Sequence, residues 1–129
     1  MMYDREELEA IAAVCTQADI YVISDEIYAC LAYDGRTFTS FASLSADAKE
    51  RTILVNGVSK AYAMTGWRIG YACANDVIAK VMANYVSHST GSPVAISQRP
   101  PPWPSPVPRR RLRPCARPLS SAATTLWSG

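Results

Sequence analysis

Apolar and polar positions follow one another along the chain in patterns that predict helices and strands. At the start, Asp4 can cap a helix, and Glu7 stands where a capping box places its acid. The next apolar residues fall at helical spacing on one face: Leu8, Ile11, Ala12 and Cys15. We therefore expect a helix that runs to about Ala18.

Three short apolar stretches predict strands, at residues 19–24, 52–56 and 67–74. The first is nearly continuous and rich in branched side chains, which is typical of a strand buried on both faces of a parallel sheet. Between the first two, Asp34-Gly35 gives a weak hairpin signal within residues 29–41. Residues 57–66 read as a loop.

The remaining pattern is helical. Residues 45–51 can form a short polar helix, and Asp76 can cap a longer one that ends before Gly91-Ser92-Pro93. Its apolar side would carry Val77, Ile78, Val81, Met82 and Tyr85. Helices that alternate with strands in this order predict an α/β layered domain.

Composition excludes several classes of protein. Of the 129 residues, 49% are hydrophobic and 19% are charged, which is near the globular average and unlike collagen, mucin or a wholly disordered chain. No apolar run approaches the ~20 residues of a membrane helix, and no export signal is visible, so we expect a cytoplasmic protein without a membrane partner.

Cysteine and histidine give no sign of a metal site. The four cysteines show no C-x-x-C spacing and the single histidine, His88, is expected to be exposed near a helix end, so neither a zinc site nor a disulfide framework is predicted. Cys15, Cys30 and Cys73 have apolar neighbours in the sequence and are expected to be small buried residues in a reducing compartment.

The net charge of +2 averages two unlike parts. Residues 1–98 sum to −4, whereas residues 99–129 contain six arginines, no acidic residue and eight of the nine prolines. Proline lacks an amide donor and opposes both helix and sheet, so this second part is expected to be disordered or to form extended polyproline structure.

Side chains capable of chemistry gather in three places. Asp25 and Tyr28 follow the first strand, Ser59 and Lys60 follow the second, and Arg68 comes eight residues later. An amine can form a Schiff base with an aldehyde cofactor, and a carboxylate can keep a pyridine nitrogen protonated. A guanidinium can bind a phosphate through two hydrogen bonds, and a serine hydroxyl can add another.

Each of these residues also has a plainer interpretation. Asp25 and Ser59 can be turn residues, Tyr28 an aromatic at the edge of the core, Arg68 an ion-pair partner and Lys60 a surface charge. Trp67 is expected to pack and not to take part in catalysis, and Glu26 is expected to be either a structural or a solvated acid.

The motifs together resemble a known family. Residues 57–70, GVSKAYAMTGWRIG, resemble the lysine-containing signature of class I aminotransferases, which are pyridoxal-phosphate enzymes of the aspartate aminotransferase fold. Residues 24–28, SDEIY, resemble the strand end that binds the pyridine ring in that family. The resemblance covers about residues 3–98 and implies part of a three-layer α/β/α large domain.

The resemblance implies a role for each candidate. Lys60 would carry pyridoxal 5′-phosphate as an internal aldimine and would act as general base and acid. Asp25 would pair with the pyridine nitrogen, and Tyr28 would hydrogen-bond the 3-hydroxyl oxygen. Ser59 and Arg68 would bind the phosphate. The implied reaction moves an amino group from an amino acid to a 2-oxo acid in a full-length homodimer.

The resemblance also leaves parts of the family's site unaccounted for. It begins at Tyr3, after the point where the family places an Asn-Pro-x-Gly motif, and it lacks the arginine that would bind the substrate carboxylate. Gly57 stands where many relatives have a hydroxyl, so one phosphate contact is expected to be missing. The isolated chain is therefore expected to be an inactive aminotransferase fragment. The alternatives are a regulatory or binding module and another pyridoxal-phosphate enzyme of the same fold.

The resemblance stops at Gln98, where charge sign and proline content also change. We therefore divide the chain into residues 1–98, the partial large domain, and residues 99–129. A frameshift in a GC-rich gene would explain the second part, because proline, arginine and alanine are typical of such codons translated out of frame. The alternative is an Arg-rich tail that binds nucleic acid or a proline-recognition domain. We favour the frameshift and so expect no nucleic-acid partner.

Overall fold

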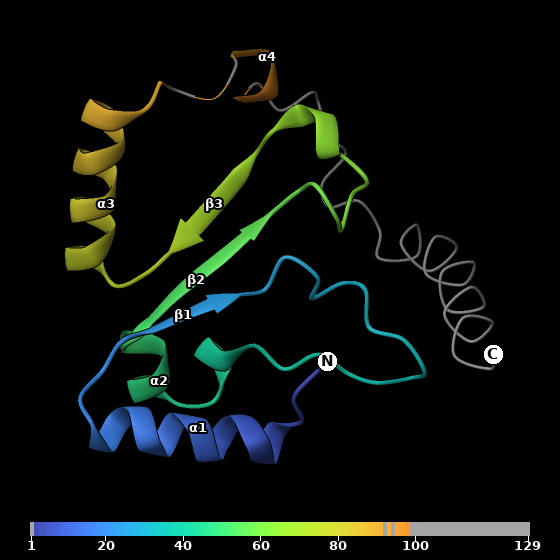
Figure 1. The fold of residues 1–129 in the computed structure, drawn as a ribbon, viewed down its shortest axis with the longest axis vertical. Helices are drawn as coiled ribbons and strands as arrows, with labels where there is room; N and C mark the ends of the chain where they lie inside the picture. The colour runs from blue at the N-terminus through green and yellow to red at the C-terminus, as the bar shows by residue number, and fades with distance from the viewer. Residues whose placement is uncertain (1, 92, 94, 99–129) are drawn as a thin grey trace.

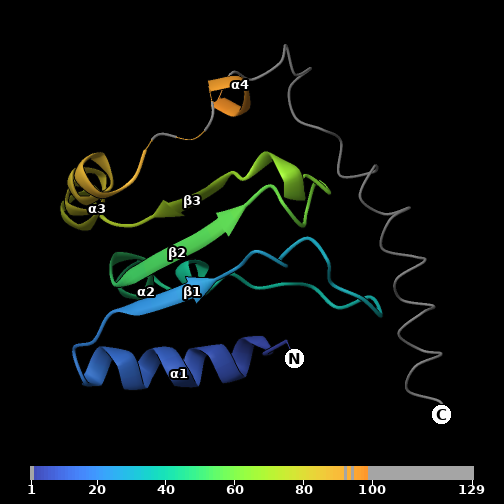
Figure 2. The ribbon, with the colours of Figure 1, turned by 45° about the horizontal axis from the view of Figure 1, so that its top comes forward.

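The computed structural model describes residues 2–91, 93 and 95–98. The disorder or extended structure expected for residues 99–129 lies outside these residues. Figures 1 and 2 show helices around a small sheet, which confirms the α/β class expected from the sequence. The elements are α1 (Arg5–Gln17), β1 (Val22–Asp25), η1 (Phe41–Ser43), α2 (Ala46–Glu50), β2 (Thr52–Gly57), η2 (Thr65–Trp67), β3 (Gly70–Cys73), α3 (Asp76–Ser89) and α4 (Ala95–Gln98).

Helix α1 begins with the predicted capping box. The Glu7 amide donates to Asp4 Oδ1 over 2.9 Å, and the Asp4 amide donates to Glu7 Oε2 over 2.8 Å. Two of the four amides that a helix start leaves unpaired are thereby satisfied. The helix ends at Gln17, and Asp19 then adopts a positive φ of 51° as the chain turns toward β1.

The sheet has the order β1-β2-β3, with β1 parallel to β2 and β3 antiparallel to β2. Val22 lies opposite Thr52 in the first pair, and Gly57 lies opposite Gly70 in the second. All three predicted strands are confirmed, although β1 and β3 each begin three residues later than expected. Both delays have a local cause: a left-handed Asp19 (φ 51°) stands at the start of the first predicted strand, and η2 and a left-handed Arg68 (φ 53°) occupy the start of the third.

The predicted hairpin within residues 29–41 is wrong. The segment holds no strand, and only its turn at Asp34-Gly35 is confirmed, with positive φ values of 57° and 72°. The Arg36 amide closes that turn by donating to the Tyr33 carbonyl over 3.0 Å. At the end of the segment, Ser40 and Phe41 donate hydrogen bonds to the Glu26 side chain. These side-chain contacts take the place of the backbone hydrogen bonds that a hairpin would have.

Burial is lower than the sequence pattern predicts. The described core contains Cys15, Phe41, Ala48 and Ala61, together with the polar residues Glu26 and Thr52. Ile23 of β1 is 72% exposed, so the expectation that β1 is buried on both faces is wrong. Cys30 and Cys73 are also exposed, against expectation, whereas Cys15 is buried. For the strands the reason is that β1 and β3 pack closely only against β2, and no described helix packs closely against either of them.

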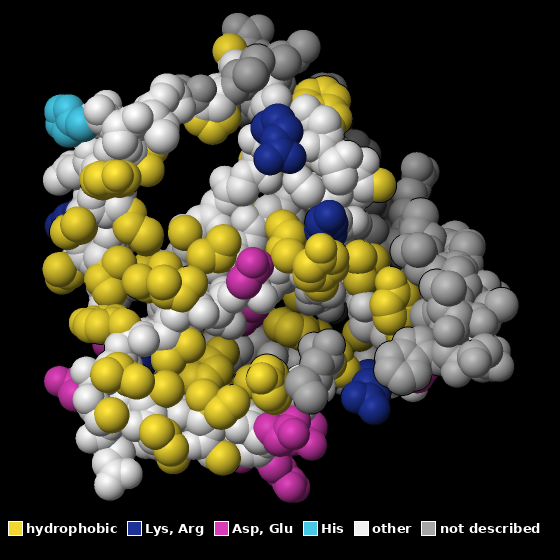
Figure 3. Space-filling view, viewed as in Figure 1, with side chains coloured by type: hydrophobic (Ala, Val, Ile, Leu, Met, Phe, Trp, Pro, Cys, Tyr) yellow, Lys and Arg dark blue, Asp and Glu magenta, His cyan; other side chains and the backbone are white. Residues whose placement is uncertain are grey.

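Helix α3 is capped by Asn75, not by Asp76 as predicted. Asn75 Oδ1 accepts from the Ile78 amide over 2.9 Å, and Asp76 is the first helical residue. The predicted apolar side is present but remains open to solvent, since Val77 and Tyr85 are more than 70% exposed. Figure 3 shows this apolar side together with an opening between α3 and β3, so α3 does not close over the sheet. His88 lies in the last turn of α3 and is exposed, as expected.

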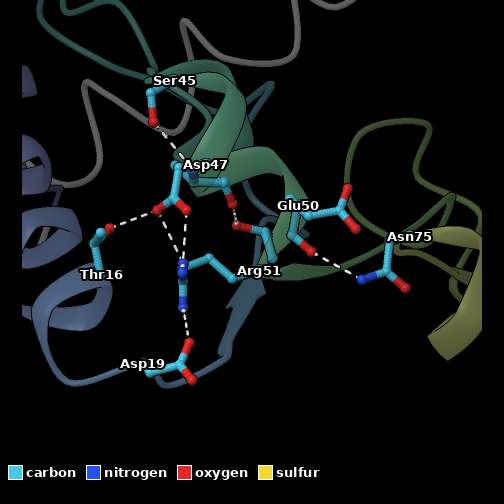
Figure 4. Close-up of polar contacts among 9 residues, drawn as sticks. Thr16, Asp19, Ser45, Asp47, Glu50, Arg51 and Asn75 are labelled. Atoms are coloured by element: carbon cyan, nitrogen blue, oxygen red, sulfur yellow. Dashed lines mark hydrogen bonds and ion pairs between the residues drawn. The ribbon is translucent and has the colours of Figure 1, made fainter.

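Polar contacts join α1 to α2 at the base of the sheet (Figure 4). Arg51 pairs with Asp47 over 2.9 Å and with Asp19 over 3.1 Å, and Thr16 donates to Asp47 over 2.6 Å. Hydrogen bonds from Arg51 and then from Thr16 hold the pKa of Asp47 below its ordinary value of 3.8. The same contacts raise the pKa of Arg51, through Asp47 first and Asp19 second. These contacts therefore favour the charged forms of both Asp47 and Arg51.

The lowered pKa of Asp47 gives stability a pH dependence. A carboxyl group whose pKa is lower in the folded state stabilises the fold above its unfolded pKa, and the contribution disappears as pH falls through the folded pKa. We expect Asp47→Asn to lower the free energy of unfolding at neutral pH, and we expect this deficit to shrink as pH falls below 3.8. Urea unfolding across that range measures it.

The control is Glu50→Gln, which removes the same charge from the same helix. Among the described residues the Glu50 side chain has no ion pair, so its deficit should be smaller and should not follow the same pH course. A deficit in Asp47→Asn that stays constant at every pH would contradict the assignment.

Candidate functional site

The carboxyl ends of β1 and β2 bring two of the predicted motifs together. Because the strands are parallel and Asp25 lies opposite Val55, both strands end at the same edge of the sheet. The Glu26 amide extends the pairing by donating to the Val55 carbonyl over 2.8 Å. Residues 25–28 and 57–60 therefore leave the sheet next to each other. Ligands of open α/β sheets bind at such an edge.

Lys60 and Tyr28 are in direct contact there. The Lys60 ammonium lies 5.5 Å from the centroid of the Tyr28 ring, within the range of a cation–π interaction. Both side chains are exposed, Tyr28 by 59%, so the contact is worth about 0.5–1 kcal/mol. The amine and the phenol expected to act on one cofactor thus lie side by side, although they come from different loops.

Asp25 closes the strand with a local turn. Its Oδ1 accepts from the Ile27 amide over 3.1 Å, which shapes the turn between β1 and Tyr28. This contact is the turn role that the sequence left open for Asp25. The carboxylate remains exposed at the same sheet edge as Lys60. Asp25 therefore has a structural contact and can also meet a ligand.

The two phosphate candidates lie in the loop after β2. Ser59 is half-buried and Arg68 is exposed at the other end of the loop. Arg68 Nη1 donates to the Thr65 carbonyl over 3.1 Å. Within residues 2–91, no hydrogen bond or ion pair joins Arg68 to Lys60 or Tyr28. The structure thus brings Lys60 and Tyr28 into contact but does not bring Arg68 against them.

The loop between β2 and β3 is closed and strained. Its ends are joined where the Val58 amide donates to the Ile69 carbonyl over 3.3 Å, and Ala61 is buried within it. Ala63 and Arg68 both adopt left-handed backbone, with φ values of 54° and 53°. For residues with a side chain this conformation costs about 1–2 kcal/mol each. Such strain often accompanies functional loops, and here it occurs beside two predicted site residues.

The close backbone approach at Gly57 was not predicted from the sequence. A Cβ atom at this position would lie 2.8 Å from the Ile69 carbonyl oxygen and 3.1 Å from Ile27 Cδ1. The backbone of Ile69, just before β3, therefore approaches the end of β2 more closely than a side chain at residue 57 would allow. The hydroxyl that the sequence analysis found missing here could not be added without moving Ile69. The available signal was a glycine at the end of a predicted strand, which often marks a close approach of the backbone.

Glu26 is the second residue whose place the sequence did not define. It is only 5% exposed, so the solvated interpretation is wrong and the structural one holds. Its Oε1 atom accepts hydrogen bonds from Ser24, Ser40 and Phe41. Trp67, at 45% exposed, contributes its carbonyl to a bond from Ser97 over 3.1 Å.

Near the candidate site, one further side chain has a shifted pKa. The pKa of Tyr71 on β3 is raised, first by partial burial and then by the neighbouring Tyr62, Cys73 and Cys30. Across the residues with described positions, no group of histidine, cysteine and acidic side chains could hold a metal ion.

Comparisons with known proteins agree with the motifs. Residues 1–98 match the family described as aminotransferase class I and II. The chain is 51% identical over 98 residues to aspartate aminotransferase of Bacillus subtilis, covering 76% of this chain and 25% of that protein. It is 48% identical over 97 residues to aspartate/prephenate aminotransferase of Thermus thermophilus, covering 75% and 24%.

Solved structures show the same likeness. The aromatic aminotransferase of Pyrococcus horikoshii superposes with a TM-score of 0.69 at 41% identity, covering 73% of this chain and 25% of that one. The chain therefore spans about a quarter of the length of the curated relatives it matches.

The close approach at Gly57 predicts the cost of a side chain there. We expect Gly57→Ala to lower the free energy of unfolding by about 1–3 kcal/mol, because the new methyl group overpacks the contact with Ile69. Gly70→Ala is the matched control, since its Cβ would lie 3.5 Å from the Asn56 carbonyl oxygen, an ordinary contact. Denaturant unfolding of both variants measures the difference. Equal costs would contradict the packing argument.

Proposed function

Since the chain belongs to the aminotransferase class I and II family, we propose that residues 1–98 form a pyridoxal-phosphate-binding part of an aminotransferase. The activity is the transfer of an amino group from an amino acid, of the aspartate type, to a 2-oxo acid. One observation supports this most directly: the Lys60 ammonium lies 5.5 Å from the Tyr28 ring at the shared end of two parallel strands.

The side chains at this edge suit the cofactor in their chemistry. An amine, a phenol and a carboxylate occupy one end of the sheet, and the exposure of Lys60, Tyr28 and Asp25 leaves them open to a ligand. When bound, pyridoxal phosphate supplies an aldehyde that reacts with amines and a ring that withdraws electrons from the substrate Cα. Lys60 Nζ would hold the cofactor and move the proton at that carbon.

The other candidates would bind and orient. The Asp25 carboxylate would keep the pyridine nitrogen protonated, and the Tyr28 hydroxyl would donate to the 3-hydroxyl oxygen of the cofactor. The Ser59 hydroxyl and the Arg68 guanidinium would hold the phosphate, Arg68 after exchanging its bond to the Thr65 carbonyl. These roles extend the resemblance residue by residue, and each can be tested by substitution.

The wider setting is also proposed. Relatives named as aspartate aminotransferases support an aspartate-type amino donor and a 2-oxo acid acceptor. We further propose a homodimer for the full-length enzyme and a cytoplasmic location. Within the described part of the chain, every helix is too short or too polar to cross a membrane.

The boundary after Gln98 divides the chain in this proposal. The family match ends at residue 98, where the chain turns from net acidic to arginine- and proline-rich. We propose that residues 1–98 are part of the large domain and that residues 99–129 arose from a frameshift. Translation of the same DNA in the other two frames tests this, since one of them should continue the family sequence. A continuation in neither frame would contradict it.

Covalent trapping tests Lys60. We expect borohydride reduction in the presence of pyridoxal phosphate to attach the cofactor to Lys60. The exposed amine of Lys60 lies beside the Tyr28 phenol, which would hydrogen-bond the 3-hydroxyl oxygen of the cofactor. Peptide mass mapping locates the attachment, which Lys60→Ala should abolish. Lys80→Ala is the control, since Lys80 is an exposed lysine of α3, and it should leave the yield unchanged. Equal labelling of Lys49, Lys60 and Lys80 would contradict the assignment.

The phosphate contact can be tested separately. We expect Arg68→Gln to weaken binding of pyridoxal phosphate about tenfold or more, because a hydrogen bond to a charged group is worth about 1.5–3 kcal/mol. Binding of pyridoxal, which has no phosphate, should not change. Arg36→Gln removes the same charge from an exposed loop and should affect neither ligand. Equal loss for both ligands in Arg68→Gln would assign Arg68 to the fold instead.

A further inference from the structure

Glu26 is the one buried carboxylate of the described residues, and the proposed chemistry does not use it. We propose that Glu26 is a positioning residue. Its carboxylate accepts hydrogen bonds from both ends of the loop of residues 27–40, a set of contacts that we call the clasp, and thereby holds Tyr28 against Lys60. The functional meaning of this inference rests on the proposed cofactor site. The structural part stands on the contacts of Glu26 alone.

Three donors converge on one oxygen of this carboxylate. Glu26 Oε1 accepts from the Ser24 hydroxyl over 3.1 Å, from the Ser40 hydroxyl over 2.8 Å and from the Phe41 amide over 3.2 Å. Ser24 belongs to β1, whereas Ser40 and Phe41 come from the far end of the loop. The carboxylate therefore joins the two ends of the segment that contains Tyr28.

Glu26 itself is fixed to the sheet. Its amide donates to the Val55 carbonyl of β2, and its carbonyl accepts from the Ala29 amide over 2.9 Å. The clasp thus ties Phe41, which is 4% exposed, to the end of β1. Hydrogen bonds to an ionised carboxylate are stronger than neutral ones, and a buried carboxylate without them is costly.

Tyr28 lies in the turn that follows β1, where Asp25 Oδ1 accepts from the Ile27 amide, and the rest of the loop has little regular structure. No strand forms within residues 27–40, and its described backbone bonds are local, such as that from the Leu31 amide to the Tyr28 carbonyl over 2.8 Å. Tyr28 follows Glu26 by two residues. The turn sets the direction of the backbone at Tyr28, and the contacts of Glu26 with Ser40 and Phe41 add the second constraint that holds its ring beside Lys60.

The position of the Tyr28 ring can be measured without any cofactor. In the full chain, NMR should place the ε-methylene protons of Lys60 upfield of their random-coil position, because they lie near the Tyr28 ring. We expect Glu26→Ala and Ser40→Ala to lose this shift. Glu26→Gln should retain it, because the amide keeps an acceptor oxygen for the same donors.

The control is Ser45→Ala, which removes the α2 cap formed with the Ala48 amide. It damages the fold away from the loop and should leave the Lys60 shift in place. Ser40→Ala decides the question if Glu26→Ala does not fold. Persistence of the shift in folded Glu26→Ala or Ser40→Ala would overturn the proposal, as would an equal loss in Ser45→Ala.

A second readout connects the clasp to the cofactor. If Glu26 acts through Tyr28, Glu26→Ala should lower the borohydride-fixed yield at Lys60 several-fold in the wild-type background but not in a Tyr28→Ala background. An equal factor in both backgrounds would mean that Glu26 only supports the fold, and would overturn the positioning role. If the wild-type chain fixes no cofactor, the proposed function fails, and the Lys60 proton shift still decides the clasp.

Discussion

The parallel pairing of β1 with β2 is the interaction on which the site depends. Asp25 lies opposite Val55, so residues 25–28 and 57–60 emerge at one edge of the sheet. A slip of one residue would turn every side chain of a strand to the opposite face. The bond from the Glu26 amide to the Val55 carbonyl extends the register beyond β1 and places Tyr28 within reach of Lys60.

Pairing with β3 adds a second constraint on the same edge. Gly57 faces Gly70, and the space that a Cβ would need at Gly57 is occupied by Ile69 and Ile27. The close contact of Gly57 with the Ile69 backbone therefore fixes the start of the segment that carries Lys60. The left-handed backbone at Ala63 and Arg68 is the conformational cost of closing the loop between Gly57 and Gly70.

Local signals in the sequence predicted the elements well. The Asp4–Glu7 capping box, the α2 helix and the parallel strands follow from spacing and side-chain type, which act over a few residues. Burial could not be predicted in this way, since it depends on what covers each face. Ile23 and Val77 have apolar patterns typical of a core, yet both are more than 70% exposed. Such exposed apolar surface is typical of contact regions.

The candidate site residues could be found from the sequence because their motifs are specific. The supporting roles of Glu26 and Gly57 could not be found in this way. Neighbours of Glu26 and Gly57 in the sequence do not reveal that Ser40 or Ile69 approaches them in space. The pair Lys60 and Tyr28 differs from Arg68 in what holds each side chain in place. Lys60 and Tyr28 are positioned by strand pairing and a buried carboxylate, both rigid constraints. Arg68 is positioned by a strained exposed loop, so its guanidinium is the group with most freedom to adjust when a phosphate arrives.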